Sequence, residues 1–198
     1  MLMEEKAMSR EVQKKFEDYA YVLDCMARGQ LSGGRPSYRA ELLVQLIGES
    51  FFTLLEAVPR SDSTISELDR VYIGKTGVRE KISHIIGRTE YGGLTSTAKI
   101  ELPVAIESIV ASNKSNFLQF FNTAQAVTTR MHSLELIPGI GKKFTWSILE
   151  ARERKPFESF EDLKERIGLS DPAKLIVKRI LEELVEKNIK YRLFTRTP

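Results

Sequence analysis

The hydrophobic pattern of the chain changes its period near Leu94, so that a strand-rich part precedes a helix-rich part. Before Leu94, short apolar runs rich in β-branched and aromatic residues alternate with turn residues, a pattern typical of strands. Gly48-Glu49-Ser50 separates two of these runs, as the turn of a β-hairpin does. The segments that we predict as strands are 19–25, 41–47, 51–58, 70–74 and 81–88.

Several short antiparallel strands with a long first loop indicate a small barrel over residues 18–93. We favour an OB-like barrel and keep an SH3-like barrel as the alternative, because five strands fit both. A standard OB-fold has a helix between its third and fourth strands, and no helical pattern is evident there in this sequence. The charged residues 1–17 are expected to form a flexible or frayed N-terminal arm.

Beyond Leu94 the apolar residues recur at helical spacing, which predicts connecting helices over residues 94–127. Thr95 or Ser96 is a candidate N-cap, and Pro103 predicts a kink or a fresh helix start. A compact aromatic cluster follows on the next helix. Its i, i+3, i+4 spacing is that of a buried face, so we assign it to the core and not to base stacking. The cluster consists of Phe117, Phe120 and Phe121.

Residues 128–187 are predicted to form an all-α domain with one clear helical hairpin and one degenerate copy. In the first unit, a helix over residues 128–136 leads into a turn, and a second helix continues to about Arg154. Trp146 lies off the apolar stripe of that helix, which predicts packing against a neighbouring helix or the barrel. In the second unit, Ser159 caps 160–167, and Asp171 starts a helix that ends near 187. Residues 188–198 are expected to be a weakly ordered tail.

The turn of the first unit carries the chemistry of a phosphate-binding site. Glycine permits backbone angles and close approaches that other residues cannot reach. If Gly141 opens the second helix, the unpaired N–H groups of that helix point outward, and two lysines add positive charge beside them. The alternative is a plain αα-hairpin with two solvated lysines. The candidate contact residues are Pro138, Gly139, Ile140, Gly141, Lys142 and Lys143.

The run from Ile137 to Lys142 resembles the helix-hairpin-helix motif. The signature of that motif is an apolar residue, Pro, Gly, an apolar residue, Gly and then a basic residue. Every position of the signature is filled here. The resemblance implies non-specific binding to a nucleic-acid backbone.

Composition places the chain among soluble globular proteins, with 42% hydrophobic and 29% charged residues. The net charge of +3 is unevenly distributed, with −1 over residues 1–127 and +4 over residues 128–198, the side that holds the hairpin. This balance suits a nucleic-acid binder. A single cysteine, Cys25, excludes an internal disulfide and a cysteine-based metal cluster. We predict no metal and no cofactor.

The N-terminus is charged and lacks the apolar core of a signal peptide, and no apolar run reaches membrane-spanning length. We therefore expect a cytoplasmic protein without a membrane partner, and we assume a monomer.

A second group of cations lies in the predicted barrel. Its first loop holds three arginines without an acidic residue, and a later basic run has only Glu80 opposing it. Tyrosine rings in these segments are candidates for base stacking. The alternative for each cation is a solvated surface charge. The candidate contact residues of the barrel are Arg28, Arg35, Tyr38, Arg39, Arg70, Tyr72, Lys75, Arg79, Lys81 and Arg88.

Taken together, seven runs of this sequence resemble an archaeal family of uncharacterised proteins. They are Tyr-Ala-Tyr-Val-Leu-Asp (19–24), Arg-Pro-Ser-Tyr (35–38), Phe-Thr-Leu-Leu-Glu (52–56), Arg-Val-Tyr-Ile-Gly-Lys (70–75), Glu-Leu-Pro (101–103), Thr-Thr-Arg (128–130) and Leu-Glu-Leu-Ile-Pro-Gly-Ile-Gly-Lys (134–142). The family joins an OB-like barrel to helix-hairpin-helix units and is described as predicted RNA-binding. The resemblance covers residues 18–185 and implies a fold and a partner class, but no catalytic activity.

The leading hypothesis is a non-catalytic nucleic-acid-binding protein, with RNA ahead of DNA as its partner. One alternative is a DNA-binding or repair-associated enzyme, because helix-hairpin-helix glycosylases place a Lys and a catalytic Asp at a spacing similar to that of Lys143 and Asp162. However, Asp162 lies in a helix N-terminal turn that favours acids on its own account, and no acidic cluster suggests a two-metal site. Another alternative is a protein-interaction scaffold, since barrel edges can bind peptides.

Overall fold

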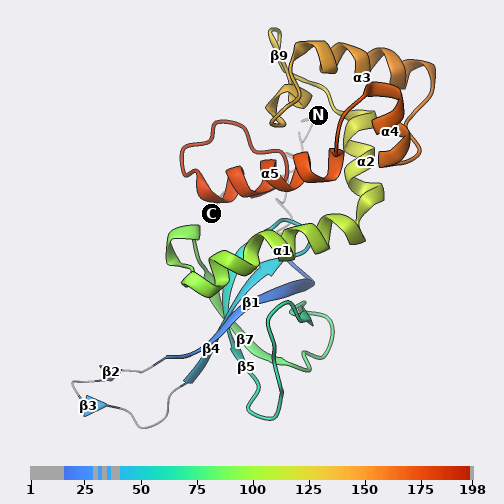
Figure 1. The fold of residues 1–198 in the computed structure, drawn as a ribbon. Coiled ribbons are helices and arrows are strands. Elements are labelled where there is room, and N and C mark those ends of the chain that lie inside the picture. The colour runs from blue at the N-terminus through green and yellow to red at the C-terminus, as the bar shows by residue number, and fades with distance from the viewer. Residues whose placement is uncertain (1–15, 29–30, 33–34, 37–40, 197–198) are drawn as a thin grey trace, which may run out of the picture.

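The computed structural model describes residues 16–28, 31–32, 35–36 and 41–196. Within these residues the fold is mixed α+β, with a curled five-stranded antiparallel sheet and five α-helices (Figure 1). The strands of this sheet are β1 (Tyr19–Arg28), β4 (Glu41–Gly48), β5 (Leu54–Pro59), β6 (Arg70–Tyr72) and β7 (Ile82–Arg88). The mixed α+β class is confirmed, whereas nearly all of the predicted N-terminal arm lies outside the described residues.

The sheet is a half-barrel with the strand order β6-β1-β4-β5-β7. Its pairings are antiparallel, with β1 between β4 and β6 and with β5 between β4 and β7. No ladder joins the edge strands β6 and β7 in the described part of the chain. The five predicted strands are therefore present, but they form an open sheet and not a closed barrel.

A buried carboxylate fixes the turn between β4 and β5. Glu17 is only 7% exposed, and its carboxylate accepts hydrogen bonds from the backbone N–H groups of Ser50 (2.9 Å), Phe51 (3.1 Å) and Thr53 (3.2 Å). The turn therefore extends beyond the predicted residues 48–50, and β5 begins at residue 54 instead of 51. Glu17 belongs to the folded sheet, although the sequence analysis placed it in the arm.

The predicted first loop contains a small ladder of its own. The pairing of β1 with β4 continues to Arg28 and Glu41, and beyond it β2 (Leu31–Ser32) pairs with β3 (Arg35–Pro36). Figure 1 shows β2 and β3 beyond the end of the sheet, away from the helices.

Both faces of the sheet are buried along much of β1, β4 and β5, which explains why these strands are largely apolar. One face lies inside the curl of the sheet, where Val22, Leu46 and Ala57 pack with Val71 and Ile82. The other face, with side chains such as Leu23 and Ile47, packs against the helices.

Helix α1 (Ser96–Ser112) follows β7 after a 3-10 turn, η1 (Tyr91–Gly93), and lies across the sheet against β1 and β4 (Figure 1). Thr95 is its N-cap, which confirms that prediction, because the hydroxyl accepts the N–H of Ala98 at 3.0 Å. The fresh helix start expected at Pro103 is absent. The buried residues Leu102 and Ile106 hold this segment against the core, and that packing outweighs the hydrogen bond that Pro103 cannot donate.

The junction between the sheet and α1 is fixed by buried polar groups. Gln45 is 1% exposed, accepts the N–H of Thr95 at 2.9 Å and donates to the carbonyl of Gly93 at 3.0 Å. The Thr95 hydroxyl in turn donates to the Asp24 carboxylate at 2.6 Å. The sheet and the first helix are thus joined by a network of hydrogen bonds as well as by apolar contact.

Helix α2 (Lys114–Thr123) buries Phe117 and Phe121, which confirms that the aromatic cluster belongs to the core. The helix predicted over residues 128–136 is wrong. That segment holds parts of a ribbon of β8 (Ala126–Thr128) with β9 (Met131–His132), followed by a single 3-10 turn, η2 (Ser133–Leu136). The consecutive Val and Thr residues at 127–129 favour extended backbone, and this local preference outweighs the apolar spacing.

Three helices complete the C-terminal part, namely α3 (Lys142–Arg154), α4 (Phe160–Ile167) and α5 (Pro172–Val185). The predicted caps of the last two are confirmed. Ser159 accepts the N–H of Asp162 at 3.0 Å, and Asp171 accepts the N–H of Lys174 at 3.1 Å. Helix α5 ends at Val185, two residues before the predicted position.

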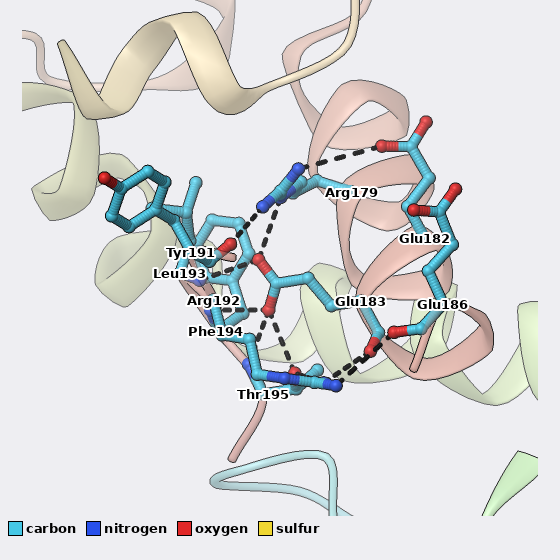
Figure 2. Close-up of polar contacts among 9 residues, drawn as sticks. All are labelled: Arg179, Glu182, Glu183, Glu186, Tyr191, Arg192, Leu193, Phe194 and Thr195. Carbon is cyan, nitrogen blue, oxygen red and sulfur yellow. Dashed lines mark hydrogen bonds and ion pairs between the residues drawn. The ribbon is translucent and has the colours of Figure 1, made fainter. Parts of the chain in front are cut away.

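Residues 193–195 are tied to α5 by the buried carboxylate of Glu183, although we expected weak order in this tail (Figure 2). Glu183 is 0% exposed, and its carboxylate accepts the Nε–H of Arg179 at 2.8 Å. The same carboxylate accepts the backbone N–H groups of Leu193 at 2.7 Å, Phe194 at 3.1 Å and Thr195 at 2.9 Å. A charge this deeply buried needs all of these partners, so the tail completes the core.

Candidate nucleic-acid interface

The hairpin turn between η2 and α3 is anchored by two buried isoleucines. Ile137 is 1% exposed and Ile140 is 3% exposed, and the N–H of Ile140 donates to the carbonyl of Ile137 at 3.0 Å. Gly139 has a φ of +90°, a left-handed conformation that favours glycine. Ile140 therefore inserts into the core, and its burial holds the turn in one position.

Gly141 differs from Gly139, because nothing in the described part of the chain requires a glycine there. Its φ of −91° suits any residue, and a Cβ atom at this position would meet no described atom within 4 Å. Gly141 is the N-cap of α3, and its carbonyl accepts the N–H of Thr145 at 3.0 Å, but without a side chain it offers no acceptor to the N–H groups that precede Thr145 in the helix. The backbone N–H groups at this helix end therefore lack a capping side chain.

The first turn of α3 is positively charged and carries no acidic residue. Lys142 and Lys143 are both exposed, and neither has an ion-pair partner among the residues that the structure describes. The positive end of the helix dipole lies at the same place and favours an anion there. This end of α3 thus combines two free ammonium groups with uncapped backbone donors.

Trp146 lies one turn further along α3 and is 71% exposed. The sequence analysis predicted that it packs against a helix or the barrel, and that prediction is wrong. Buried residues such as Thr145 and Ile148 form the core face of α3, and Trp146 points away from it. The sequence signal for exposure was the position of Trp146 off the apolar stripe of α3. A residue in that position can either face solvent or pack on a second face of the helix.

A histidine caps the 3-10 turn that precedes the hairpin. His132 Nδ1 accepts the N–H of Leu134 at 3.1 Å, and the Glu135 carboxylate accepts the N–H of His132 at 2.9 Å, which together form a capping box. Burial lowers the pKa of His132, and the nearby Arg152 guanidinium adds to this effect. The neutral imidazole is the form that can accept the N–H of Leu134, so the cap is complete near neutral pH.

In contrast, several cations of the predicted barrel surface are already bound by other side chains of the protein. Arg70 binds the Glu49 carboxylate at 2.7 Å and lies over the ring of Tyr19 at 3.7 Å. Lys81 binds the Asp69 carboxylate at 2.6 Å. The hydrogen bond from Lys81 lowers the pKa of Asp69, which keeps this ion pair charged.

The loop between β6 and β7 uses its other candidate residues in the same way. The Arg79 Nε–H donates to the carbonyl of Gly74 at 3.0 Å, and Lys75 lies over the ring of Phe16 at 3.5 Å. The half-buried Tyr72 accepts the N–H of Gly77 at 2.8 Å, and its ring packs edge-on against Tyr19. These residues come together on one face, but their first role there is to hold the loop.

Of the remaining barrel candidates, Arg88 is exposed on the edge strand β7 and has no ion-pair partner among the described residues. Arg28 and Arg35 are placed by their backbone alone, in β1 and β3. Tyr38 and Arg39 lie outside the described residues.

The hairpin and the barrel residues do not form one continuous site. Figure 1 shows α3 at one end of the molecule and the sheet at the other, with α1 and α5 between them. A ligand that touches both groups must therefore extend along the protein.

Asp162 is the residue whose spacing from Lys143 resembles that of the catalytic aspartate in helix-hairpin-helix glycosylases. Here its side chain is already bound within the protein. Its carboxylate binds Arg166 at 3.1 Å and accepts the N–H of Glu158 at 3.1 Å. Across the described ranges, no three His, Cys, Asp or Glu side chains gather as metal ligands. In those same ranges, no helix combines the length and the apolar character needed to cross a membrane.

Comparison with known proteins identifies the family. The model of a family described as "Protein of unknown function (DUF655)" matches residues 16–196. A Methanocaldococcus jannaschii protein, described as uncharacterized protein MJ0038, is 45% identical over 184 residues, which cover 92% of this chain and 82% of that protein. The crystal structure of Af1531 from Archaeoglobus fulgidus aligns with a TM-score of 0.80 at 49% identity, over 91% of this chain and 100% of that one.

The chain belongs to the DUF655 family. This membership confirms that the chain is similar to uncharacterised archaeal proteins, as the sequence analysis expected.

Proposed function

We propose that this DUF655 protein is a non-catalytic nucleic-acid-binding protein that holds a phosphate backbone at the N-terminus of α3. The proposal rests on the absence, within the part of the chain that the structure describes, of capping and neutralising side chains at Gly141, Lys142 and Lys143. The N-cap has no side chain, the first turn has no acid, and both lysines lack ion-pair partners among the described residues. Backbone donors and a helix dipole aimed at one point suit a phosphate group.

The combination of Gly141 with open space around it supports a ligand at this point. A serine or aspartate there would cap the helix with its side chain and stabilise it by roughly a few tenths of a kcal/mol relative to glycine. Since the conformation and the free volume admit such a residue, the bare glycine gains nothing for folding. It leaves the N–H groups of α3 accessible, which is what close approach of a phosphate requires.

The hairpin is accordingly assigned as a helix-hairpin-helix unit with a shortened first helix. The turn η2 takes the place of that helix, and Ile137 and Ile140 anchor the hairpin on either side of Gly139. The second unit, from α4 to α5, lies against the first, since the Leu175 side chain lies next to Gly139. Without a Gly-x-Gly turn, this unit supports the first one and does not repeat its contact.

We assign the half-barrel as OB-like. Counting only the strands of the main sheet, the first pairs with the second and fourth, and the third pairs with the fifth. Such non-consecutive pairing is typical of a partly open Greek-key barrel, in which the loops after the first and fourth strands contact nucleic acid. The second of these loops holds Lys75 and Arg79, and it supplies the second contact surface, together with the exposed Arg88.

We favour RNA over DNA as the partner. A hairpin unit holds a backbone without reading sequence, while OB-like barrels bind single strands. A molecule with both surfaces suits structured RNA, in which paired and unpaired segments alternate.

The test uses Gly141→Asp with Gly141→Asn as its matched control. Both side chains fit the open space and cap α3, so both variants are expected to fold and to melt at or above the temperature of the native protein. The aspartate places a negative charge where the phosphate is expected, and the asparagine does not. We expect Gly141→Asp to lose salt-dependent binding to RNA, measured by fluorescence anisotropy over a range of salt concentrations.

The asparagine variant separates charge from steric cover. It is expected to bind more weakly than the native protein but more tightly than Gly141→Asp, because its amide occupies the backbone donors without repelling the phosphate. Equal affinity of Gly141→Asp and the native protein, with both folded by circular dichroism, contradicts the proposal.

A further inference from the structure

The exposed indole of Trp146 is not explained by the fold. At 71% exposed it is the most exposed aromatic side chain in the described residues, compared with 50% for Phe16 and 38% for Tyr19. Tryptophan is enriched at interfaces, because its large ring gains free energy when a ligand or partner covers it.

The position of Trp146 on α3 links it to the uncapped helix end. It follows Lys142 by four residues and Lys143 by three, and residues at these spacings are neighbours on a helix surface. Helical side chains tilt toward the N-terminus, so the ring lies over the turn that carries the two lysines. Four residues rise about 6 Å along a helix.

The charges around the indole favour a nucleic-acid ligand. The first turn of α3 contains no acidic residue, and Glu150, one turn beyond Trp146, is bound by Arg154. An aromatic ring between free lysines and a neutralised carboxylate is a surface suited to a base whose phosphate is bound nearby.

We propose that Trp146 stacks on an unpaired base next to the phosphate held by Gly141–Lys143, so that the hairpin selects single-stranded or unpaired segments over continuous duplex. This inference rests on the proposed function of the hairpin. The faces of bases in a duplex are covered by their neighbours, and only unpaired bases offer a face to an aromatic side chain.

The protein provides its own probe, because Trp146 is its single tryptophan. Titration with a short single-stranded RNA is expected to quench the tryptophan fluorescence, and a blunt duplex of the same sequence is expected to bind with little quenching. Tryptophan fluorescence of the free protein is recorded at increasing protein concentration as a control for self-association.

The variants are Trp146→Ala, with Trp146→Phe as its matched control, and Gly141→Asp. Because Trp146 is exposed, both substitutions at this position are expected to leave the fold intact. We expect Trp146→Ala to weaken binding of the single strand about five- to a hundredfold, the range for stacking on one base, with little change for the duplex. Trp146→Phe is expected to restore most of the affinity, since a phenyl ring also stacks.

The outcomes separate this inference from the proposed function. If Gly141→Asp abolishes binding while Trp146→Ala leaves it unchanged, the hairpin holds phosphate and the stacking proposal is wrong. If Trp146→Ala weakens binding of the duplex and of the single strand equally, the proposed selectivity for unpaired segments is wrong. If the native protein binds neither RNA, both proposals are wrong. A concentration-dependent spectral shift without RNA assigns the indole to a contact between two copies and overturns stacking.

Discussion

The two ends of the molecule treat their positive charges differently. At the hairpin, Lys142 and Lys143 stand without ion-pair partners among the described residues, next to a helix end that has no capping side chain. On the sheet, Arg70 is bound by Glu49, and Lys81 is bound by Asp69. Both groups looked similar in the sequence as clusters of cations beside glycines. The difference lies in the carboxylates that the fold brings to the sheet and does not bring to α3.

This contrast shows that a binding surface differs from a structural one in whether its cations lack ion-pair partners, and not in the number of cations. The carboxylates involved, Glu49 and Asp69, are 21 and 12 residues from their partners, so sequence spacing does not show these pairs. Charge at the hairpin is expected to control binding, while the paired charges of Arg70 and Lys81 on the sheet are expected to control stability. The predictions below test this division from the largest effect to the smallest.

Charge reversal at the hairpin gives the largest effect. We expect Lys142→Glu with Lys143→Glu to weaken RNA binding at least a hundredfold, because two attractive charges become repulsive beside the phosphate. The slope of log K against log salt is expected to fall by about 1 for each lost phosphate contact. Binding is measured by anisotropy at several salt concentrations, and the melting temperature is expected to change little.

The matched control reverses Lys114 and Lys164, which are exposed on α2 and α4 and make the same change in net charge. It is expected to lower affinity only by the general effect of net charge. A control variant as weak as the hairpin variant shows that net charge, and not the site, controls binding.

Substitution of the two hairpin glycines gives an intermediate effect that divides the turn into a structural and a binding half. We expect Gly139→Ala to cost about 1–2 kcal/mol of unfolding free energy, because an alanine is strained at a φ of +90°. Its Cβ would also lie 3.4 Å from Leu175. Chemical denaturation measures this cost.

Gly141→Ser is the companion variant, since serine fits the open space and caps a helix. It is expected to keep or raise stability while it weakens RNA binding. Equal destabilisation by the two substitutions contradicts the division between the glycines.

The smallest effect is expected at the sheet, where Asp69→Asn removes the partner of Lys81. The pair is partly exposed, so we expect a loss of no more than about 1 kcal/mol of unfolding free energy. The pKa of Asp69 is lowered in the fold, so its contribution is present above the ordinary value of 3.8 and is lost as the pH falls through the folded value.

The measurement compares the unfolding free energies of native protein and Asp69→Asn from neutral pH down to about pH 3. The two curves are expected to approach each other as the pH falls through the folded pKa of Asp69, because the native carboxylate then becomes protonated as well. RNA affinity at neutral pH is expected to change little. A marked gain in affinity, caused by the freed ammonium group of Lys81, places Lys81 in the binding surface.

Local signals in the sequence were sufficient for most elements. The strands carry β-branched and apolar runs, and the caps Thr95, Ser159 and Asp171 were visible as residue types at helix starts. The strand order and the open edge between β6 and β7 could not be predicted, because they depend on pairings between residues far apart in the chain.

The errors have a common cause. The expected helix at 128–136, the packed position of Trp146 and the weakly ordered tail were each inferred from the local sequence alone. Spacing cannot show that Glu183 collects the backbone N–H groups of residues 193–195, because a buried carboxylate is an unusual centre for a core. It also cannot distinguish an indole that packs on a neighbour from one that faces solvent.

The hydrogen bonds of Gln45 and Thr95 have a consequence for how a long ligand would fit. They connect β4 to the start of α1 through groups that are buried or partly buried, and Thr95 continues the connection to Asp24 on β1. Such a junction resists bending, and α1 in turn packs against α5, so these contacts hold the C-terminal helices at a set distance from the sheet. An RNA that reaches both ends must therefore fit a fixed span, and a flexible strand or a bend in its helix has to make up any difference in length.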